Sequence, residues 1–283
     1  MHIILHSLEH ALGDSLKILP FLFFTYLVME FLEKKAGKKA NGWLEKAGKT
    51  GPVIGGILGV IPQCGMSTVA SNLYAGRVIS VGTLMAIYLS TSDEMLPIMI
   101  SQSVSGGIIA KVLIVKVVIA ILAGALVDFL HHRWRKKEQE EMKIHDFCEH
   151  EHCHCEDGIL KSAVRHTLQI FFFVFLITIV LNIGVEVVGE EKLSNFILNK
   201  PMVGPIMAGM IGLIPNCAAS VVITKMFLDG LMSFGTMMTG LLVGAGVGIL
   251  VLLRVNEDRK ESLEIIGILY VIGVLCGIIL NII

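Results

Sequence analysis

The sequence has few charged residues. Only 17% of the 283 residues are Asp, Glu, Lys or Arg, whereas 54% are hydrophobic. So few charges cannot cover the surface of a soluble globular protein of this size. Several apolar runs reach the length of about 20 residues that crosses a bilayer. They lie at roughly 12–32, 52–75, 78–100, 108–130, 167–188, 203–228, 231–253 and 263–283. We therefore expect an all-α, polytopic membrane protein in contact with lipid.

Several common motifs are missing. The N-terminus (MHIILHSLEHALGDSLK) lacks the basic region and cleavage site of a signal peptide, so we expect the first span to be retained. No GxxxxGK[ST] motif is present, which argues against ATP coupling within this chain. Neither HExxH nor a convincing Ser–His pair occurs, so we expect no enzyme and no cofactor. We expect no nucleic acid partner, and the sequence leaves a homodimer open.

The chain contains an internal repeat. When Gly51 is aligned with Gly204 without gaps, 13 of the next 35 positions are identical, Pro62/Pro215 and Cys64/Cys217 among them. Shared apolar composition would rarely match Pro, Cys and Gly at fixed offsets. We therefore expect a first membrane repeat at 1–130, a charged linker at 131–158 and a second membrane repeat at 159–283.

The charges in the loops indicate that the two repeats have opposite orientations. Residues 33–50 and the segment HHRWRKK at 131–137 are basic, and basic short loops favour the cytoplasm. The counterpart of the first loop, VVGEEKLSNFILNK, is acidic to neutral and fits the outside. Inverted repeats of this kind recur in transporters. The linker is then cytoplasmic and both termini lie outside.

Crossing parity identifies a segment that does not cross. Both basic loops are expected in the cytoplasm, so the chain between them must cross the membrane an even number of times. Three apolar runs lie between them, so one of the three does not cross. Pro62 to Gly65 divides run 52–75 into two pieces, each about half a bilayer long. We predict a re-entrant helical hairpin here and a second one at 204–229. Each repeat then has three full transmembrane helices and one hairpin, about ten helical segments in all. A kinked single span is the alternative.

The two hairpin tips would place polar side chains near the middle of the membrane, where inverted-repeat transporters bind their substrates. Amides, hydroxyls and thiols of this kind are ligands for borderline cations, although Ser and Cys also pack as small residues between helices. The candidate substrate-binding residues are Gln63, Cys64, Ser67, Asn216, Cys217 and Ser220.

The following span contains two adjacent acids, Asp93 and Glu94, in LSTSDEMLP. Each acid near the bilayer centre costs about 2.5–3.5 kcal/mol on insertion scales, so a structural explanation is difficult. We predict a cation site in a broken helix, and a salt bridge to Lys111, Lys116 or Arg77 is the alternative. The second repeat has Gly246 and Val247 at these positions. The site is therefore asymmetric, and its expected metal ligands are Asp93, Glu94, Cys64, Cys217 and Asn216.

Two further features are weaker candidates for cation binding. Glu30 matches Glu186 in the repeat, and either acid fits a substrate site or a helix end at the membrane interface. The linker segment IHDFCEHEHCHCEDG is dense in imidazole and thiol groups, which suit transition metals. We interpret it as a flexible accessory chelating segment, with a solvated loop as the alternative. Its candidate ligands are His145, Cys148, His150, His152, Cys153, His154 and Cys155.

Four stretches resemble a family of bacterial ten-segment permeases described as manganese or heavy-metal exporters and arsenic-efflux proteins. They are IPQCGMS, LYAGR, LSTSDE and PFLFFTYLVMEFLE. The resemblance covers nearly the whole chain outside the linker, and it implies a place in the bacterial cytoplasmic membrane. It also implies a site role for Gln63, Cys64, Asp93 and Glu94, which lie within these motifs.

Three functional hypotheses follow. The first is a secondary exporter of divalent metal ions (Mn, Zn, Co, Ni or Cd), in which protons and metal compete for the two carboxylates. The second is an arsenite or organoarsenical permease that uses Cys64 and Cys217. The third is a metal-sensing membrane protein that acts through its linker.

Overall fold

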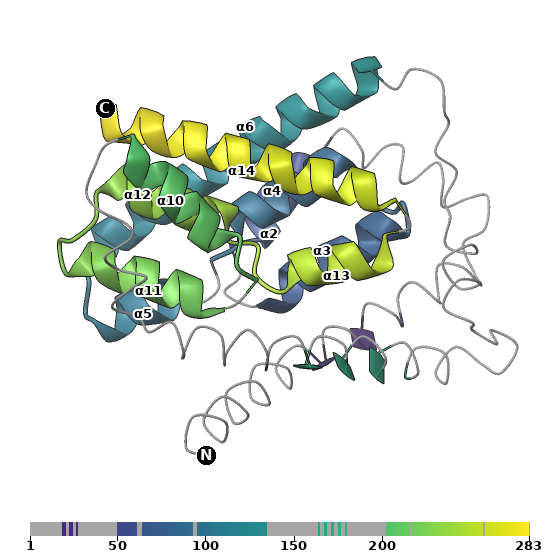
Figure 1. Ribbon diagram of the computed structural model, residues 1–283, viewed down its shortest axis with the longest axis horizontal. Coiled ribbons are helices and arrows are strands. Elements are labelled where there is room, and N and C mark those ends of the chain that lie inside the picture. The colour runs from purple at the N-terminus through teal and green to yellow at the C-terminus, as the bar shows by residue number, and fades with distance from the viewer. Residues whose placement is uncertain are drawn as a thin grey trace, which may run out of the picture.

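The computed structural model describes residues 50–60, 64–92, 95–134, 202–215, 217–256 and 258–282, and isolated residues within 19–27 and 164–179. The elements in these ranges are α-helices (Figure 1). In the first half of the chain they are α2 (Gly51–Leu58), α3 (Cys64–Ala75), α4 (Val81–Ser90), α5 (Met95–Ser101) and α6 (Gly106–Trp134). In the second half they are α10 (Val203–Gly212), α11 (Cys217–Leu228), α12 (Phe234–Val243), α13 (Gly248–Val255) and α14 (Arg259–Ile282).

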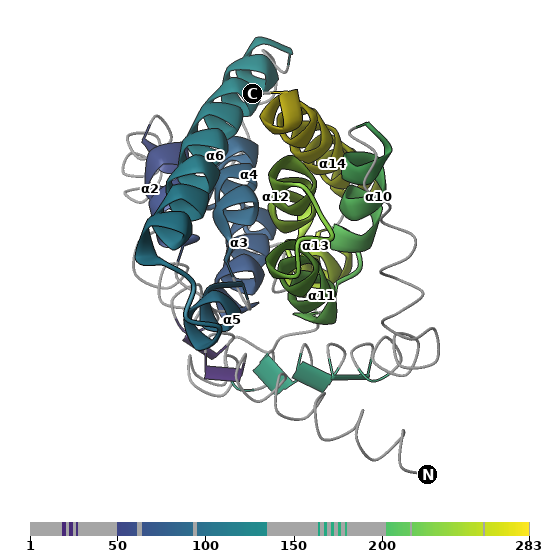
Figure 2. The same cartoon turned by 90° about the vertical axis from the view of Figure 1, so that its left-hand side faces the viewer.

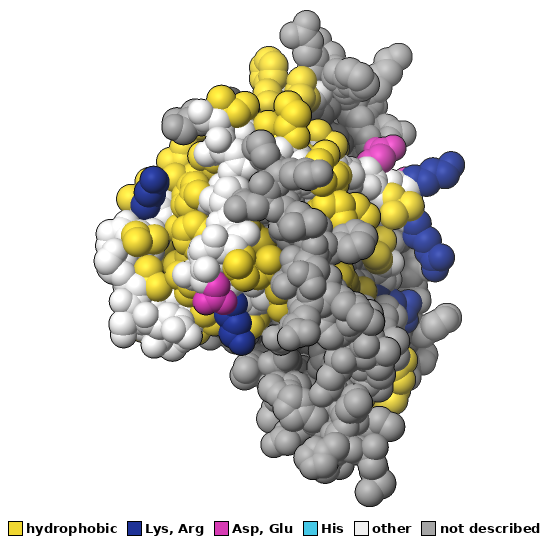
Figure 3. All heavy atoms as spheres, turned by 60° about the vertical axis from the view of Figure 1, so that its left-hand side comes forward, with side chains coloured by type: hydrophobic (Ala, Val, Ile, Leu, Met, Phe, Trp, Pro, Cys, Tyr) yellow, Lys and Arg dark blue, Asp and Glu magenta, His cyan; other side chains and the backbone are white. Residues whose placement is uncertain are grey.

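Three segments of the described chain are long and apolar enough to cross a membrane: Gly106–Leu130, Phe234–Val255 and Arg259–Ile282. Large apolar side chains point outward from α6 and α14, for example Leu122 at 65% exposure and Leu275 at 55%. Figure 3 shows one face on which hydrophobic side chains cover much of the described surface and charged side chains are few. The all-helical architecture and this apolar surface are those of a multi-pass membrane protein.

Equivalent helices begin 153 residues apart. The pairs α3 and α11, α4 and α12, and α6 and α14 have first residues at this spacing. Their starts also agree in detail, because Ser80 caps α4 by accepting a hydrogen bond from the Thr83 amide, and Ser233 caps α12 through the Thr236 amide. The repeat in the sequence therefore corresponds to a repeat of helices and of helix caps.

The two halves lie side by side (Figure 2). At the centre α4 lies beside α12, with α2 and α6 packed on α4 and with α10 and α14 packed on α12. Further contacts join the halves, because α3 packs mainly on α13, α11 packs on α5, α14 contacts α4 and α12 contacts α6. Each half therefore completes the packing of the other.

The short helices before each central helix change direction. Helix α2 runs parallel to α4, because Gly51 at its start lies against Thr83 and Gly59 just after its end lies against Ser90. Helix α3 then returns to the loop at 76–80, from which α4 starts. In the second half, Gly212 lies against Gly240 of α12, and Phe227 near the end of α11 contacts Phe234 at the start of α12, with ring centroids 6.1 Å apart.

The long helices α6 and α14 run in opposite directions (Figure 1). Asp128 near the end of α6 accepts a hydrogen bond from Ser80 Oγ at 2.7 Å, and Glu261 in the first turn of α14 binds Arg77 at 2.9 Å. The last turns of α6 and the first turn of α14 therefore lie at the same end of the molecule, beside the loop at 76–80. We call this end the Arg77 end.

Candidate functional site

Both central helices are interrupted in the middle of the molecule. Helix α4 ends at Ser90 and α5 begins at Met95, whereas α12 ends at Val243 and α13 begins at Gly248. Gly246 has φ of 54°, a left-handed conformation that favours glycine. The Gly-rich sequence therefore permits the interruption of α12, as the sequence pattern indicates. Interrupted helices at membrane depth are typical of transporter binding sites.

A buried lysine connects the two interruptions. Lys116 of α6 is 0% exposed. Its Nζ donates hydrogen bonds to the carbonyl oxygen of Thr91 and, at 3.0 Å, to that of Leu241. Thr91 is the C-cap residue that follows α4, and Leu241 lies in the last turn of α12. One ammonium group therefore binds the ends of two helices, one from each half.

The chemistry of helix ends explains this contact. The last four carbonyl groups of an α-helix have no partner within the helix, and they give its C-terminus a partial negative charge. Where the C-terminal ends of α4 and α12 meet, these charges attract a cation. The described structure places the Lys116 ammonium there, where two backbone carbonyl groups accept its hydrogen bonds.

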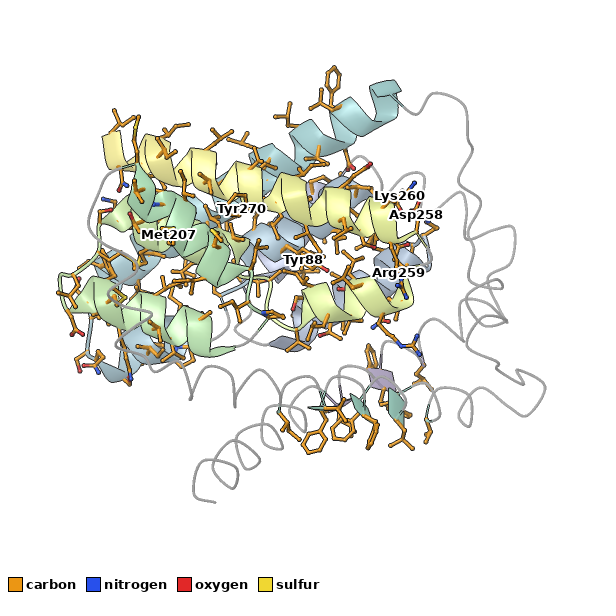
Figure 4. The ribbon with its side chains drawn as sticks, in the orientation of Figure 1. Tyr88, Met207, Asp258, Arg259, Lys260 and Tyr270 are labelled. Atoms are coloured by element: carbon orange, nitrogen blue, oxygen red, sulfur yellow. The ribbon has the colours of Figure 1, made fainter. Side chains whose placement is uncertain are left out.

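Polar side chains of α3 and α4 lie close to the start of α13. Ser71 Oγ donates to the Gly248 carbonyl oxygen at 2.8 Å and lies 2.7 Å from the Tyr88 hydroxyl. Tyr88 also donates to the Gly248 carbonyl at 3.2 Å. Figure 4 shows Tyr88 within the helical body, whereas the charged residues Asp258, Arg259 and Lys260 lie where α14 begins. This cluster makes a second polar contact between the two halves.

The close packing of this cluster involves a predicted site residue, Ser67. A Cβ atom on Gly248 would lie 2.6 Å from the Ser67 Cβ, so only glycine allows α13 to approach α3 this closely. The equivalent cluster in the second half is incomplete. Thr224 donates to the Ser220 carbonyl at 2.7 Å, but Leu241 stands at the position equivalent to Tyr88. The polar centre is therefore asymmetric.

The other predicted site residues are described in part or not at all. Ser67 is buried and Ser220 is half-buried. Cys64 and Cys217 are the first residues of α3 and α11, while their side chains lie outside the described part of the structure. The remaining predicted residues lie outside the described residues. These are Gln63, Asp93, Glu94, Asn216, Glu30 and all seven residues of the linker.

Within the described ranges, no group of three or more His, Cys, Asp or Glu side chains is placed to hold a metal ion. The described part of the site instead offers backbone carbonyls, hydroxyls and one ammonium group. Asp93 and Glu94 follow Thr91 closely in the sequence, directly after Ser92. They would have to supply the negative charge of a metal site.

Sequence reasoning missed three residues of the polar centre: Ser71, Tyr88 and Lys116. For Lys116 a signal was present, because a lysine inside a 25-residue apolar span is costly and usually faces the interior of the bundle. We considered it only as a salt-bridge partner for the acids. Ser71 and Tyr88 had no such signal, since both residue types are also common in membrane helices that pack against one another.

A comparison with protein-family models identifies one match, ArsP_2, which is described as "Putative, 10TM heavy-metal exporter". It matches residues 2–187 and 155–283, nearly the whole chain. The chain belongs to this family. No curated protein and no solved structure matches the chain. The resemblance seen in the sequence motifs is thus confirmed, and the ArsP_2 description agrees with the multi-pass architecture.

Membership in ArsP_2 gives the polar centre a context. The family is one of transporters, so the substrate implied by its description is a metal ion that crosses the lipid bilayer. A metal exporter needs a place where a cation can reside between the two sides of the membrane. Among the described residues, the two helix ends that bind Lys116 hold a positively charged group between the two halves.

Proposed function

We propose that this protein is a secondary exporter of divalent transition-metal ions, such as manganese, across the bacterial cytoplasmic membrane. The observation that best supports this proposal is the position of Lys116. Its buried ammonium group lies where the C-terminal ends of α4 and α12 meet. Interrupted helices in transporters use such carbonyl ends to coordinate cations.

The directions of the helices support an inverted-repeat mechanism. Helices α2 and α3 run in opposite directions beside α4, and α6 runs opposite to its equivalent α14 (Figure 1). In our proposal α2–α3 and α10–α11 are re-entrant hairpins that enter from opposite sides of the membrane. Cys64 and Cys217 then lie at the two tips, near the interruptions of the central helices.

The charges of the site suggest how binding and release are coupled. Asp93 and Glu94 would contribute two negative charges, and Lys116 contributes one positive charge beside the Thr91 carbonyl. A divalent ion that binds the two carboxylates would repel the ammonium group and weaken its contacts with the helix ends. Cys64, Asn216 and Cys217 complete the metal coordination in this proposal, while Gln63, Ser67, Ser220 and Glu30 line the path of the ion. Protons compete with metal for the same carboxylates and could drive exchange.

Transport into proteoliposomes tests the proposal. Mn, Zn, Co, Ni, Cd and arsenite are offered in parallel, with and without a proton gradient, to the wild type and to Asp93→Asn, Glu94→Gln, Cys64→Ser and Cys217→Ser. We expect gradient-dependent transport of at least one divalent metal, abolished by either acid variant and reduced by the cysteine variants. Unchanged metal transport in both acid variants would sink the proposal.

The same experiment distinguishes two alternatives. Cys64 and Cys217 have equivalent positions at the starts of α3 and α11, and their thiols are soft ligands that favour a soft substrate. An arsenite permease is therefore the second candidate. It predicts that the thiols are essential and the acids are not. A metal sensor that acts through the linker predicts loss of function on deletion of residues 144–157. An exporter would lose only affinity or regulation.

A further inference from the structure

An ion pair joins the two halves at the Arg77 end. The guanidinium group of Arg77 donates to both carboxylate oxygens of Glu261, with Nη2–Oε2 at 2.9 Å and Nη1–Oε1 at 3.2 Å. Arg77 lies in the loop between α3 and α4, and Glu261 lies in the first turn of α14. Their side chains are only 16% and 6% exposed. The pair is therefore a bidentate contact, largely removed from solvent, between parts of the chain that belong to different halves.

Neighbouring polar groups hold the pair in place. Arg77 Nη1 also donates to the Tyr74 hydroxyl at 3.2 Å, and its guanidinium carbon lies 5.2 Å from the centroid of the Tyr74 ring. On the other side, Asn256 Nδ2 donates to Glu261 Oε2 at 3.2 Å and to Ser262 Oγ at 2.9 Å. Bidentate pairs with fixed geometry are the strong ones among charge-assisted hydrogen bonds.

Among the described residues, the repeat has no equivalent pair at the opposite end. The position equivalent to Arg77 is Gly230, and the position equivalent to Glu261 is Ile108, which is 43% exposed. Neither residue has a charge. A contact between halves at that end is made by Lys111 Nζ, which lies 5.1 Å from the centroid of the Phe234 ring. A single exposed cation–π contact is weaker than a buried bidentate ion pair. The two ends are thus held together differently, although their backbones repeat.

The backbone at Arg77 adopts a conformation that favours glycine. Arg77 has φ of 55° and Gly230 has φ of 72°, so both are in the left-handed conformation that favours glycine. The first half keeps an arginine where the second half has the better-suited residue. Fold stability is a weak reason for this choice, because a buried ion pair adds little over well-packed apolar residues. A function that requires the pair to form and break explains the arginine better.

We propose that the Arg77–Glu261 ion pair is a gate that holds the two halves together at the cytoplasmic end and breaks when the exporter opens to take up metal. This inference rests on the proposed export function. The Arg77 end includes the last turns of α6, in which the basic segment HHRWRKK begins, and the exposed Arg254, Arg259 and Lys260. Figure 4 shows the last two at the start of α14. By the positive-inside rule, this end faces the cytoplasm.

Side-specific labelling tests the gate. Ser71 faces the Gly248 carbonyl across the boundary between the halves, so a Ser71→Cys side chain reports their separation. The label is a membrane-impermeant maleimide, applied from either face of membrane vesicles to a chain whose six native cysteines are replaced by serine. Arg77→Gly and Glu261→Gln are each expected to accelerate labelling from the cytoplasmic face at least about tenfold, with no change from the outer face.

Two further variants separate a gate from a general loosening of the fold. The charge-reversed pair, Arg77→Glu with Glu261→Arg, should return the cytoplasmic labelling rate towards that of the parent. Ser80→Ala removes the cap of α4 at the same end without touching a contact between halves, and it should leave labelling unchanged from both faces. Melting temperatures are recorded for every variant.

The possible results are distinct. No acceleration in either single variant, or equal acceleration from both faces, would overturn the gate. Because labelling uses no metal, the gate can fail while metal transport by the wild type stands. Conversely, side-specific labelling together with absent metal transport would leave the gate in place and remove the proposed substrate.

Discussion

Asp128 and Asn281 make the same contact in the two halves. Asp128 Oδ1 accepts a hydrogen bond from the Gly82 amide at 2.7 Å, and Asn281 Oδ1 accepts one from the Gly235 amide at 2.9 Å. Each long helix thereby binds the unpaired amide groups at the start of the central helix beside it. One position has a charged group and the other a neutral one, so the contact needs an acceptor oxygen and not a charge.

Asp128→Ala should therefore destabilise the protein by about 2 kcal/mol, since it leaves the Gly82 amide and the Ser80 hydroxyl without this acceptor. Asp128→Asn should cost less than about 1 kcal/mol, because Asn281 already performs the same function. Thermal unfolding of the purified protein in detergent measures both. Equal losses for the two variants would show that the negative charge itself is required.

Gly277 should tolerate no side chain. A Cβ at this position would overlap the Thr239 hydroxyl and lie 2.6 Å from the Gly235 carbonyl oxygen, so Gly277→Ala would separate α14 from α12. We expect a cost of about 1–3 kcal/mol. Gly267 on the same helix has no atom within 4 Å of its added Cβ, and Gly267→Ala is the matched control. The control should be neutral or stabilising by up to about 1 kcal/mol in the same unfolding experiment.

Lys116→Met should abolish metal transport while Lys111→Met should not. The first variant removes the cation from two helix ends and leaves the Thr91 and Leu241 carbonyls without its hydrogen bonds, at a cost of about 1–3 kcal/mol for each unsatisfied group. Lys111 lies five residues earlier on the same helix but is exposed. Lys116→Arg keeps the charge and should retain more transport than Lys116→Met. Equal transport by the Lys116→Met and Lys111→Met variants would remove Lys116 from the mechanism.

Single cysteines should report opposite sides of the membrane for two loops. We expect labelling of the linker at 144–157 from the cytoplasm only, and of residues 188–202 from the outside only. The prediction follows from the basic loops and from the opposite directions of α6 and α14 (Figure 1). Labelling of both segments from one side would end the inverted-repeat interpretation.

Much of the helical framework was predictable, because it depends on residues with strong local effects. Long apolar runs predicted the three candidate spans of the described residues, and the matched Pro, Gly and Cys residues predicted helices that begin at the same spacing in both halves. The interruption of α12 follows from its Gly-rich sequence, and the one between α4 and α5 from the polar residues before Pro97. These features act within a few residues of the chain.

Contacts between distant parts of the chain were not predictable. Nothing near Arg77 in the sequence indicates Glu261, and we considered Arg77 as a partner for Asp93 or Glu94. In the structure Arg77 pairs with Glu261, and Asp93 and Glu94 lie outside the described residues. Likewise, the two carbonyl groups that bind Lys116 belong to Thr91 and Leu241, which lie 25 residues before and 125 residues after it in the sequence, and backbone acceptors have no sequence signature. Periodicity and composition do not determine which helices become neighbours.

The exchange of short helices between the halves has a consequence for biosynthesis. Helix α3 packs mainly on α13, and α5 on α11, so the first half cannot bury these surfaces until the second half has been made. After the first half is made, the ribosome must still synthesise the linker and the helices α10, α11 and α12 before it reaches α13. After insertion of the first half alone, the surface of α3 that packs on α13 is therefore still uncovered. The Ser71 hydroxyl on this surface gains its hydrogen bond to the Gly248 carbonyl only when α13 has been inserted.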